Sequence, residues 1–257
     1  MILEETIKKL HDLKLGAMAD ATRELLTKPP GHKLSFEEQL GLLVEHEWTD
    51  RQNKALARRL KQAKLGQSAC LEDVSCEPER GLDKAVVRSL ASCQWVRSKQ
   101  NVIVVGLTGV GKSYIGAALA QAACRNGFRA LFTRVPRLLH ELGIARADGS
   151  YMKLLARLAT VHVLVLDDFL ISPLKDTERR DLLEILEDRY NKCSTVIASQ
   201  LPTKKWHEAL SDPTLADAIC DRVVHNAHVL SLKGPSIRKR NGMNEGKEAT
   251  TEKTEKN

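Results

Sequence analysis

Residues 106–113 read GLTGVGKS and fill every fixed position of the pattern G-x-x-x-x-G-K-[ST]. A run of β-branched residues, 102–105, precedes the pattern, and an alanine-rich stretch of helical character, 114–120, follows it. A strand, a glycine-rich loop and a helix in this order are the context that a phosphate-binding loop (P-loop) requires. The alternative, an ordinary glycine-rich turn between a strand and a helix, leaves Lys112 and Ser113 without a role.

The chemistry of this loop follows from its geometry. Its glycines let the backbone turn so that its N–H groups point at phosphates, with a helix N-terminus behind them. Lys112 is expected to reach the β and γ phosphates, and Ser113 to hold Mg²⁺. The sequence therefore predicts a site for ATP and Mg²⁺. The predicted nucleotide-binding residues here are Gly106, Thr108, Gly109, Val110, Gly111, Lys112, Ser113 and Tyr114.

A second apolar run, residues 161–166, ends in two carboxylates, Asp167 and Asp168. Such a strand is expected to be buried on both faces of a parallel sheet, and its carboxyl end lies where open α/β sheets bind ligands. Asp167 is expected beside the metal ion, and Asp168 where it can orient or deprotonate the attacking water. Two acids after a strand are, by themselves, more often a helix N-cap pair. Because these two follow a P-loop, they are predicted to be catalytic.

Composition limits the classes of protein to which the chain can belong. A length of 257 residues suits one α/β domain and a smaller one. The sequence predicts neither a membrane span nor a signal peptide. The six cysteines form no C-x-x-C pair, and Cys70 and Cys76 have no matching second pair. This pattern favours reduced thiols in a cytoplasmic protein over a disulfide or zinc framework.

The positive excess belongs to residues 81–238. This range carries 22 Lys and Arg against 15 Asp and Glu, and its net charge therefore equals the +7 of the whole chain. Aromatic residues are only 4% of the chain. A basic protein that is poor in aromatic residues is expected to bind a polyanion through backbone contacts and not by base stacking.

Residues 1–78 are predicted to form a helical N-terminal domain. Prolines and a glycine at 29–31 interrupt the helical periodicity, and Ser35 and Glu38 form a capping box that opens a further helix. Residues 48–50 are predicted to form a turn.

The helix predicted at residues 51–64 carries six basic residues and no acid. A solvated helix face, which is the alternative, usually mixes both signs, so contact with a DNA backbone is weighed equally with it. The candidate DNA contacts on this helix are Arg51, Lys54, Arg58 and Lys61.

Beyond a break near residues 77–81, strand and helix patterns alternate, which predicts a parallel sheet covered on both faces. The predicted ATPase domain is 79–238, and the polar tail 239–257 is predicted to be disordered. Strands are expected at 102–105, 129–133, 161–166, 194–199 and 228–232, and helices at 112–126, 136–158 and 177–192.

Three polar residues after the acidic strand add to the predicted site. Gln200 ends a strand and is the candidate sensor of the γ-phosphate or the attacking water, with Ser199 as the alternative. Arg222 ends a helix and is predicted to enter a neighbouring subunit's site, where it would neutralise charge in the transition state. Arg238 lies beyond the last strand, where a second sensor would contact the nucleotide. Each arginine alone is more often part of a surface ion pair.

The chain resembles the IstB-like ATPases, which are AAA+ helper proteins encoded beside the transposase of certain bacterial insertion sequences and are related to the DnaC helicase loader. The resemblance covers nearly all of the chain short of the tail. Besides the P-loop and the acidic strand, it rests on residues 47–51, 80–83, 121–125, 145–151, 199–202, 205–208, 212–218 and 221–227.

The resemblance implies an α/β P-loop (AAA+) fold with five parallel strands, in which the strand that ends at Gln200 lies between the P-loop strand and the acidic strand. It also implies a helical insertion within residues 135–157 and no C-terminal lid. Asp168 stands where many AAA+ proteins have glutamate. The basic insertion is a second candidate DNA surface, with the predicted contacts Arg134, Arg137, Arg146 and Lys153.

Together these features predict an ATP-dependent assembly factor for transposition. ATP and Arg222 would join protomers into a ring or helical homo-oligomer on duplex DNA. The oligomer would deform the DNA and present it to a partner transposase. Hydrolysis, assisted by Asp168 and Gln200, would then remove the contact between protomers. The alternatives are a helicase loader acting on single-stranded DNA, and a small-molecule kinase or a nucleotide-gated adaptor.

Overall fold

The computed structural model describes residues 2–27 and 34–237. Its contacts divide the chain into two compact units, Met1–Arg58 and Arg59–Asn257. The interruption of the helical pattern predicted at residues 29–31 lies outside the described residues, as do Arg238 and the predicted tail 239–257.

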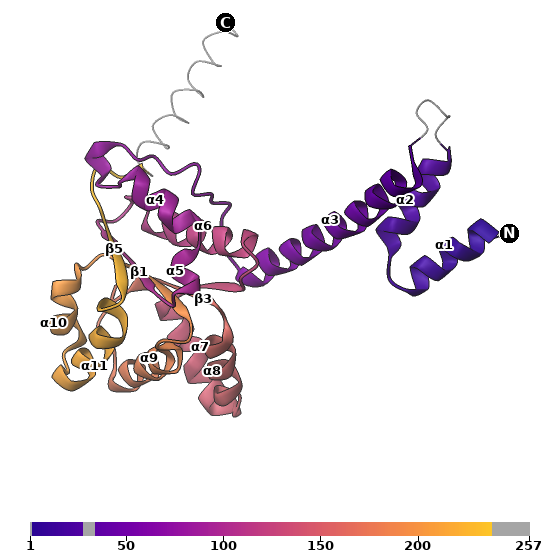
Figure 1. The fold of residues 1–257 in the computed structure, drawn as a ribbon. Helices are drawn as coiled ribbons and strands as arrows, with labels where there is room; N and C mark the ends of the chain where they lie inside the picture. The colour runs from indigo at the N-terminus through magenta and orange to yellow at the C-terminus, as the bar shows by residue number, and fades with distance from the viewer. Residues whose placement is uncertain (1, 28–33, 238–257) are drawn as a thin grey trace, which may run out of the picture. The chain divides into compact units, whose positions relative to one another are not determined.

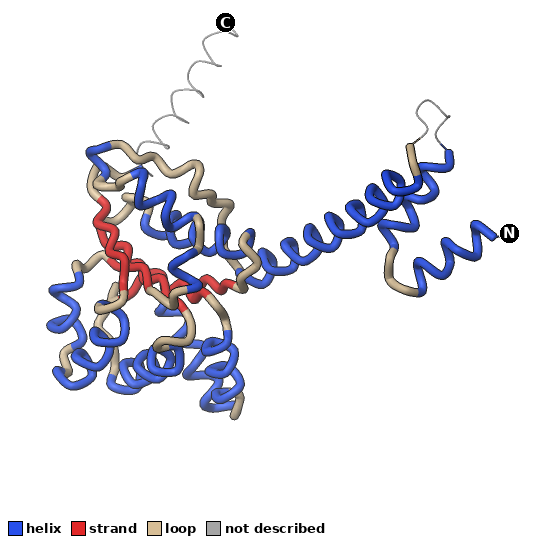
Figure 2. The backbone as a smooth tube through the Cα atoms, in the orientation of Figure 1, coloured by secondary structure: helices blue, strands red, loops and turns tan. Residues whose placement is uncertain are grey.

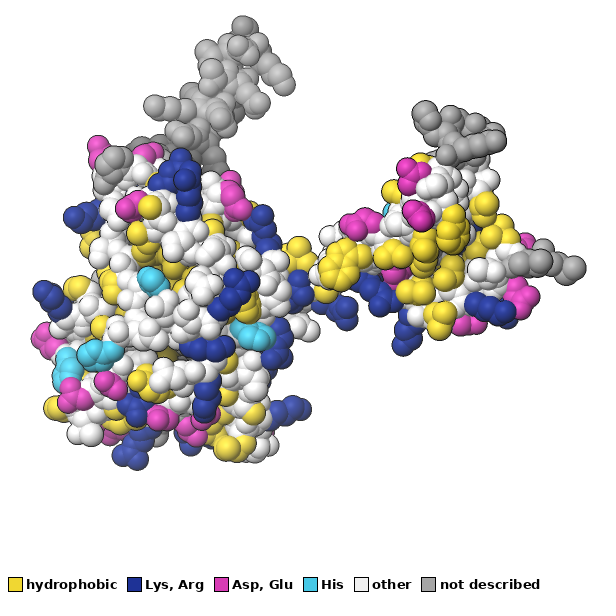
Figure 3. Space-filling model, viewed as in Figure 1, with side chains coloured by type: hydrophobic (Ala, Val, Ile, Leu, Met, Phe, Trp, Pro, Cys, Tyr) yellow, Lys and Arg dark blue, Asp and Glu magenta, His cyan; other side chains and the backbone are white. Residues whose placement is uncertain are grey.

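The first unit is helical (Figures 1 and 2), as predicted. It contains α1 (Ile2–Asp12), α2 (Gly16–Thr27) and the first part of α3 (Phe36–Ala63). Its buried apolar side chains are few and mostly small, as at Ala19 and Ala21. Hydrophobic side chains gather on its surface in Figure 3. The exposed ones include Leu3, Leu13, Leu26, Phe36, Leu40, Val44 and Trp48.

Helix α3 begins as predicted but continues where a turn was expected. Ser35 and Glu38 form the capping box: the Ser35 N–H donates to Glu38 Oε2 at 2.7 Å, and the Glu38 N–H donates to Ser35 Oγ at 3.3 Å. The turn predicted at residues 48–50 is wrong, because all three residues are helical. The segment has neither glycine nor proline to end the helix, and the Lys54–Asp50 ion pair, 2.7 Å between Nζ and Oδ2, spans one helical turn within it.

The second unit is built on a five-stranded parallel sheet with strand order β2-β3-β4-β1-β5. This confirms the predicted fold class and the position of β4 between β1 and β3. The unit's described part ends shortly after β5, and no lid domain follows within it. The strands are β1 (Asn101–Gly106), β2 (Ala130–Arg134), β3 (Val163–Phe169), β4 (Ser194–Ser199) and β5 (Ala227–Leu232).

Helices cover both faces of the sheet (Figure 1). On one face lie α4 (Lys84–Ala91), α5 (Gln94–Arg97) and α6 (Lys112–Arg125). On the other face lie α7 (Val135–Asp148), α8 (Tyr151–Thr160), α9 (Asp176–Arg189), α10 (Trp206–Leu210) and α11 (Pro213–Val224). Because side chains of a strand alternate between its faces, Leu164 and Leu166 pack into the α7–α11 core, whereas Val165 faces Gly116 of α6.

The insertion after β2 is two helices, whereas residues 136–158 were predicted as one. Helix α7 ends at Gly149, whose φ of 80° is a left-handed conformation that glycine adopts readily. Asp148 Oδ1 then accepts a hydrogen bond from the Ser150 N–H at 2.9 Å. The break follows from this local C-cap chemistry, which the apolar periodicity does not reveal.

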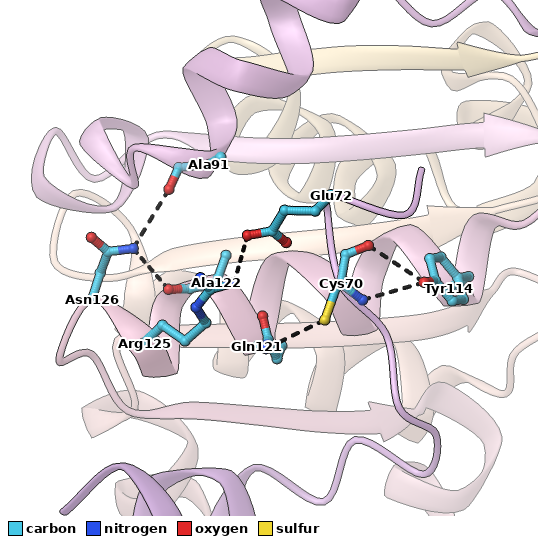
Figure 4. A network of polar contacts seen from close by, with 8 residues as sticks. All are labelled: Cys70, Glu72, Ala91, Tyr114, Gln121, Ala122, Arg125 and Asn126. Atoms are coloured by element: carbon cyan, nitrogen blue, oxygen red, sulfur yellow. Dashed lines mark hydrogen bonds and ion pairs between the residues drawn. The ribbon is translucent and has the colours of Figure 1, made fainter. Parts of the chain in front are cut away.

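We call residues 64–80 the strap, and within it Cys70 and Glu72 lie beside α6 (Figure 4). The Cys70 N–H donates to the Tyr114 hydroxyl at 3.3 Å, and Gln121 Nε2 donates to Cys70 Sγ at 3.6 Å. Arg125 pairs with Glu72 at 2.6 Å. These contacts join the strap to the sheet unit, which by its contacts comprises Arg59–Asn257.

No helix in the described part of the chain combines the length and the apolar character needed to cross a bilayer.

Candidate nucleotide-binding site

The P-loop joins β1 to α6, as the sequence predicts, and its backbone requires glycine at two positions. A Cβ on Gly106 would lie 2.6 Å from the Leu232 carbonyl oxygen, a backbone atom that cannot move aside. Gly111 has a φ of 100° as the N-cap of α6, a conformation that side-chain-bearing residues rarely adopt. The loop thus leads directly into the N-terminus of α6, and glycine-rich loops in this position suit phosphate through their backbone N–H groups.

Lys112 lies at the start of α6, and only 8% of it is exposed. Its Nζ donates to the Leu107 carbonyl oxygen at 2.9 Å, so the ammonium group lies against the P-loop. Arg80 of the strap also contacts the loop, because its Nη2 donates to the Val110 carbonyl oxygen at 2.9 Å. Lys112 and Arg80 thus both contact the backbone of the P-loop.

Ser113 and Asp167 come together from α6 and β3. Ser113 Oγ donates to Asp167 Oδ1 at 3.0 Å. Burial raises the pKa of the Asp167 carboxyl above its usual value, while the hydrogen bond from Ser113 opposes the rise. Mg²⁺ takes oxygen ligands from one or two protein side chains, with phosphate and water completing its shell. These two side chains therefore fit as the residues that would hold Mg²⁺.

Asp168 follows in a bulge of β3. Leu166 pairs with Ile197 and Phe169 with Ser199, so β3 advances three residues while β4 advances two. Asp168 has a φ of 58° and a partly exposed carboxylate, and its Oδ2 lies 3.7 Å from Nε of Arg134 at the end of β2. Bulges commonly redirect side chains beside active sites. The bulge thus leaves the Asp167 carboxylate buried and the neighbouring Asp168 carboxylate partly exposed.

Gln200 follows β4, between the strands that carry the P-loop and the two acids. Its Oε1 accepts a hydrogen bond from Thr108 Oγ1 of the P-loop at 2.9 Å. Ser199, the alternative sensor, is fully buried and bonded to backbone groups. Of the two, only Gln200 faces the P-loop.

A cavity of about 430 Å³ lies beside the P-loop; Asp167 is not part of its lining. The predicted residues Thr108, Gly109, Gly111, Lys112, Ser113, Tyr114, Asp168 and Gln200 all contribute to its wall. Sequence reasoning missed the opposite wall, because strap residues carry no phosphate-binding pattern; only Arg80 falls in a stretch that carries the family resemblance. The missed lining residues are Gln67, Asp73, Val74, Ser75 and Arg80 of the strap, together with Ile115 and Ile237.

Arg222 lies at the other edge of the sheet from the P-loop. Its carbonyl oxygen accepts a hydrogen bond from Nδ2 of Asn101, the first residue of the strand whose last residue is Gly106. Five residue steps of a strand span about 16 Å. The guanidinium pairs with Glu187 of α9. Arg222 therefore lies remote from the loop of its own chain.

The predicted DNA contacts have varied surroundings. Arg51 pairs with Glu47 and Lys54 with Asp50, whereas Arg58 and Lys61 are exposed on α3. The exposed Lys153 lies on α8.

Arg134 and Arg137 line a second cavity of about 650 Å³ that also contains Asp167 and Asp168. Positive charge therefore lies next to the two acids, although Arg137 also pairs with Glu141 at 3.0 Å.

Arg146 belongs to a network that the sequence did not suggest. Its guanidinium pairs with the buried Asp181 and stacks on the Tyr151 ring, 4.0 Å from the ring centroid. The Tyr151 hydroxyl donates to Asp181 at 2.8 Å, and burial with the neighbouring carboxylates raises its pKa. The network connects α7, α8 and α9, so Arg146 has a structural role besides any contact with DNA.

The sequence of the chain is similar to those of named proteins. The family model described as IstB-like ATP binding protein matches residues 8–245. A Sinorhizobium fredii protein named as an insertion sequence ATP-binding protein is 46% identical over 239 residues, 93% of this chain and 98% of that protein. The ATP-binding protein of insertion sequence IS1162 from Pseudomonas fluorescens is 47% identical over 204 residues, 79% of this chain and 88% of that protein.

Among solved structures, the DnaC helicase loader matches with a TM-score of 0.53. The sequences are 21% identical, and the match covers 66% of this chain and 100% of that one. At this identity the likeness concerns the fold alone.

Proposed function

The chain belongs to the IstB-like ATP-binding protein family, and from that premise we propose that it is an ATPase that assembles on duplex DNA to assist a partner transposase. The observation that carries the proposal is the Ser113–Asp167 contact of 3.0 Å beside the buried Lys112, in a chain that matches this family along most of its length. The insertion-sequence names of the relatives support the link to transposition.

The site residues suit hydrolysis of a bound nucleoside triphosphate. The P-loop N–H groups and Lys112 would hold the β and γ phosphates. Mg²⁺ held by Ser113 and Asp167 would neutralise charge on the phosphate oxygens. Asp168, which is open to solvent, would accept a proton from the attacking water, and Gln200 would orient that water or the γ-phosphate.

The position of Arg222 supports assembly through the nucleotide. An arginine at the sheet edge remote from its own P-loop can act on a phosphate only in another copy of the chain. A γ-phosphate bound in one protomer and contacted by Arg222 of the next would join the two protomers. Loss of that phosphate by hydrolysis would weaken the contact between them. Basic side chains near the insertion and on α3 would bind the DNA backbone.

Sedimentation of the full chain with ATP and Mg²⁺ tests this proposal. Duplex and single-stranded DNA of equal length are supplied in separate cells. We expect large, ATP-dependent complexes on the duplex. Assembly confined to single strands would favour a helicase-loading function instead, and assembly on neither would contradict the proposal.

Arg222→Ala is expected to leave ATP affinity unchanged while turnover on DNA falls by about a thousandfold or more, as it does when other arginine fingers are absent. Large complexes should also fail to sediment. Glu187→Gln is the matched control, because it removes the ion-pair partner of Arg222 and keeps the arginine. Normal turnover by Arg222→Ala on duplex DNA would refute its role between protomers.

Asp167→Asn is expected to stabilise the nucleotide-free fold and to abolish Mg²⁺-dependent ATP binding. The raised pKa means that the folded state binds a proton more tightly than the unfolded state, so the stability contributed by Asp167 falls as pH rises above about 3.9, the ordinary aspartate value. At neutral pH the asparagine variant should therefore unfold at a higher temperature than the wild type.

The partly exposed Asp168 supplies the control, since Asp168→Asn should retain Mg²⁺-dependent binding. An Asp167→Asn protein that melts below the wild type, or that binds MgATP normally, would contradict the assignment of Asp167.

A further inference from the structure

Ser199 is the last residue of β4, and its side chain is fully buried. Its Oγ donates to the Phe169 carbonyl oxygen at 2.8 Å and accepts from the Leu201 N–H at 3.1 Å. Phe169 directly follows Asp168, and Leu201 directly follows Gln200. One hydroxyl therefore connects the backbone next to the proposed base with the backbone next to the proposed sensor.

The strand ladder is interrupted just before the backbone that Ser199 holds. Pairing between β3 and β4 stops after Leu166–Ile197 and resumes at Phe169–Ser199, and the bulge between them contains Asp168. Asp168 and Leu170 have φ values of 58° and 55°, a left-handed conformation that is uncommon for residues other than glycine. The Ser199 hydroxyl therefore adds a side-chain contact at the point where pairing resumes, next to Asp168.

An aromatic contact and a further hydrogen bond connect the same two backbone segments. The Phe169 ring packs against the buried Trp206, with 4.8 Å between ring centroids. Trp206 Nε1 in turn donates to the Leu201 carbonyl oxygen at 2.9 Å. Phe169, Ser199, Leu201 and Trp206 thus form a closed set of contacts that connects the ends of β3 and β4. Because Ser199 and Trp206 are both fully buried, water is poorly placed to replace the hydroxyl.

We propose that Ser199 is a positioning residue for hydrolysis, whose buried hydroxyl sets Asp168 and Gln200 at the separation that the reaction needs. The inference rests on the proposed ATPase function. Ser199 does not line the nucleotide cavity, and the contacts given above for Lys112, Ser113 and Asp167 do not involve it. Its loss should therefore change the rate of the chemical step and leave ATP binding in place.

The test compares three variants of the full chain. Ser199→Ala is expected to lower kcat about tenfold to a hundredfold, the range usual for residues that orient a reactive group, with KM and ATP affinity unchanged. Ser199→Thr keeps the hydroxyl and should restore most of the rate. Ser194→Ala is the matched control: Ser194 is also buried on β4, its Oγ donates to the Trp95 carbonyl oxygen at 3.4 Å, and it lies at the other end of the strand. Unfolding midpoints are recorded for each variant.

A merely structural role would lower stability in Ser199→Ala and Ser194→Ala alike and would leave kcat equal in both. That result, or a wild-type kcat in Ser199→Ala, would overturn the inference. If the wild type binds ATP but hydrolyses none on any DNA, the proposed ATPase function fails. The inference about Ser199 then fails with it, whereas a wild-type kcat in Ser199→Ala of a protein whose wild type is active overturns the inference alone.

Discussion

Lys112→Ala is expected to reduce the affinity for ATP at least about a hundredfold and to abolish ATP-dependent complexes on DNA. The ammonium group is buried beside the P-loop, where it would meet the most highly charged part of a bound nucleotide. Truncating one member of a buried, hydrogen-bonded charge pair costs about 2–5 kcal/mol, and each 1.4 kcal/mol is tenfold in affinity.

Titration calorimetry with ATP and Mg²⁺ measures this effect. Lys192→Ala, which removes an exposed lysine from the same unit, is the control and should bind as the wild type does. The unfolding midpoint of each nucleotide-free variant is recorded, so that affinities are compared only between folded proteins. Retention of wild-type affinity by Lys112→Ala would show that the loop does not bind the phosphates.

Arg189→Met is expected to lower the free energy of unfolding by about 3 kcal/mol or more. Arg189 is 1% exposed, and burial lowers its pKa to about 10, which still leaves it charged at neutral pH. No carboxylate pairs with it among the described residues. Its donors instead serve the carbonyl oxygens of Leu158, Val161 and Ser194 and the hydroxyl of Thr195.

The cost arises because methionine would leave these acceptors buried without donors, at about 1–3 kcal/mol each, whereas removal of the buried charge offsets only part of it. Urea unfolding at pH 7 measures the difference. Arg180→Met on the same helix, where the side chain is exposed, is the matched control and should change stability by less than about 0.5 kcal/mol. An equal, small effect in both variants would mean that Arg189 does not connect α8 and α9 with the beginnings of β3 and β4.

Most of the fold and the centre of the site are predictable from the sequence. The pattern at 106–113, the acidic strand and the alternation of strands and helices indicate a parallel α/β sheet, and the strands lie within a few residues of their expected positions. The juxtaposition of Ser113 with Asp167 follows from the same reasoning, because the carboxyl ends of parallel strands meet at one edge of the sheet. The position of β4 between β1 and β3 came from the family resemblance, whereas the places of β2 and β5 were not predicted, since local patterns carry no information on which strand lies beside which.

Other features depended on interactions that no local pattern reports. Residues 48–50 read as a turn because threonine and aspartate favour turns, but they are helical, and two ion pairs, Glu47–Arg51 and Asp50–Lys54, each span one turn of α3 there. The strap has no periodicity, yet it forms one wall of the nucleotide cavity through its contacts with α6. Arg146 reads as one more basic residue of the insertion, and only the packing of three helices brings the buried Asp181 to it.

The sequence by itself determined the P-loop, its two acids, the capping box of α3 and the class of fold, because each depends on residues that are close together in the chain or on a short-range period. Tertiary structure alone decided that Arg222 lies at the sheet edge remote from its own P-loop, that Arg189 donates only to uncharged acceptors, and that Ser199 connects the residues beside Asp168 and Gln200. Each of these depends on contacts between segments that are distant in sequence. Burial then determines which polar group finds which partner, because a polar group removed from water must be paired within the protein.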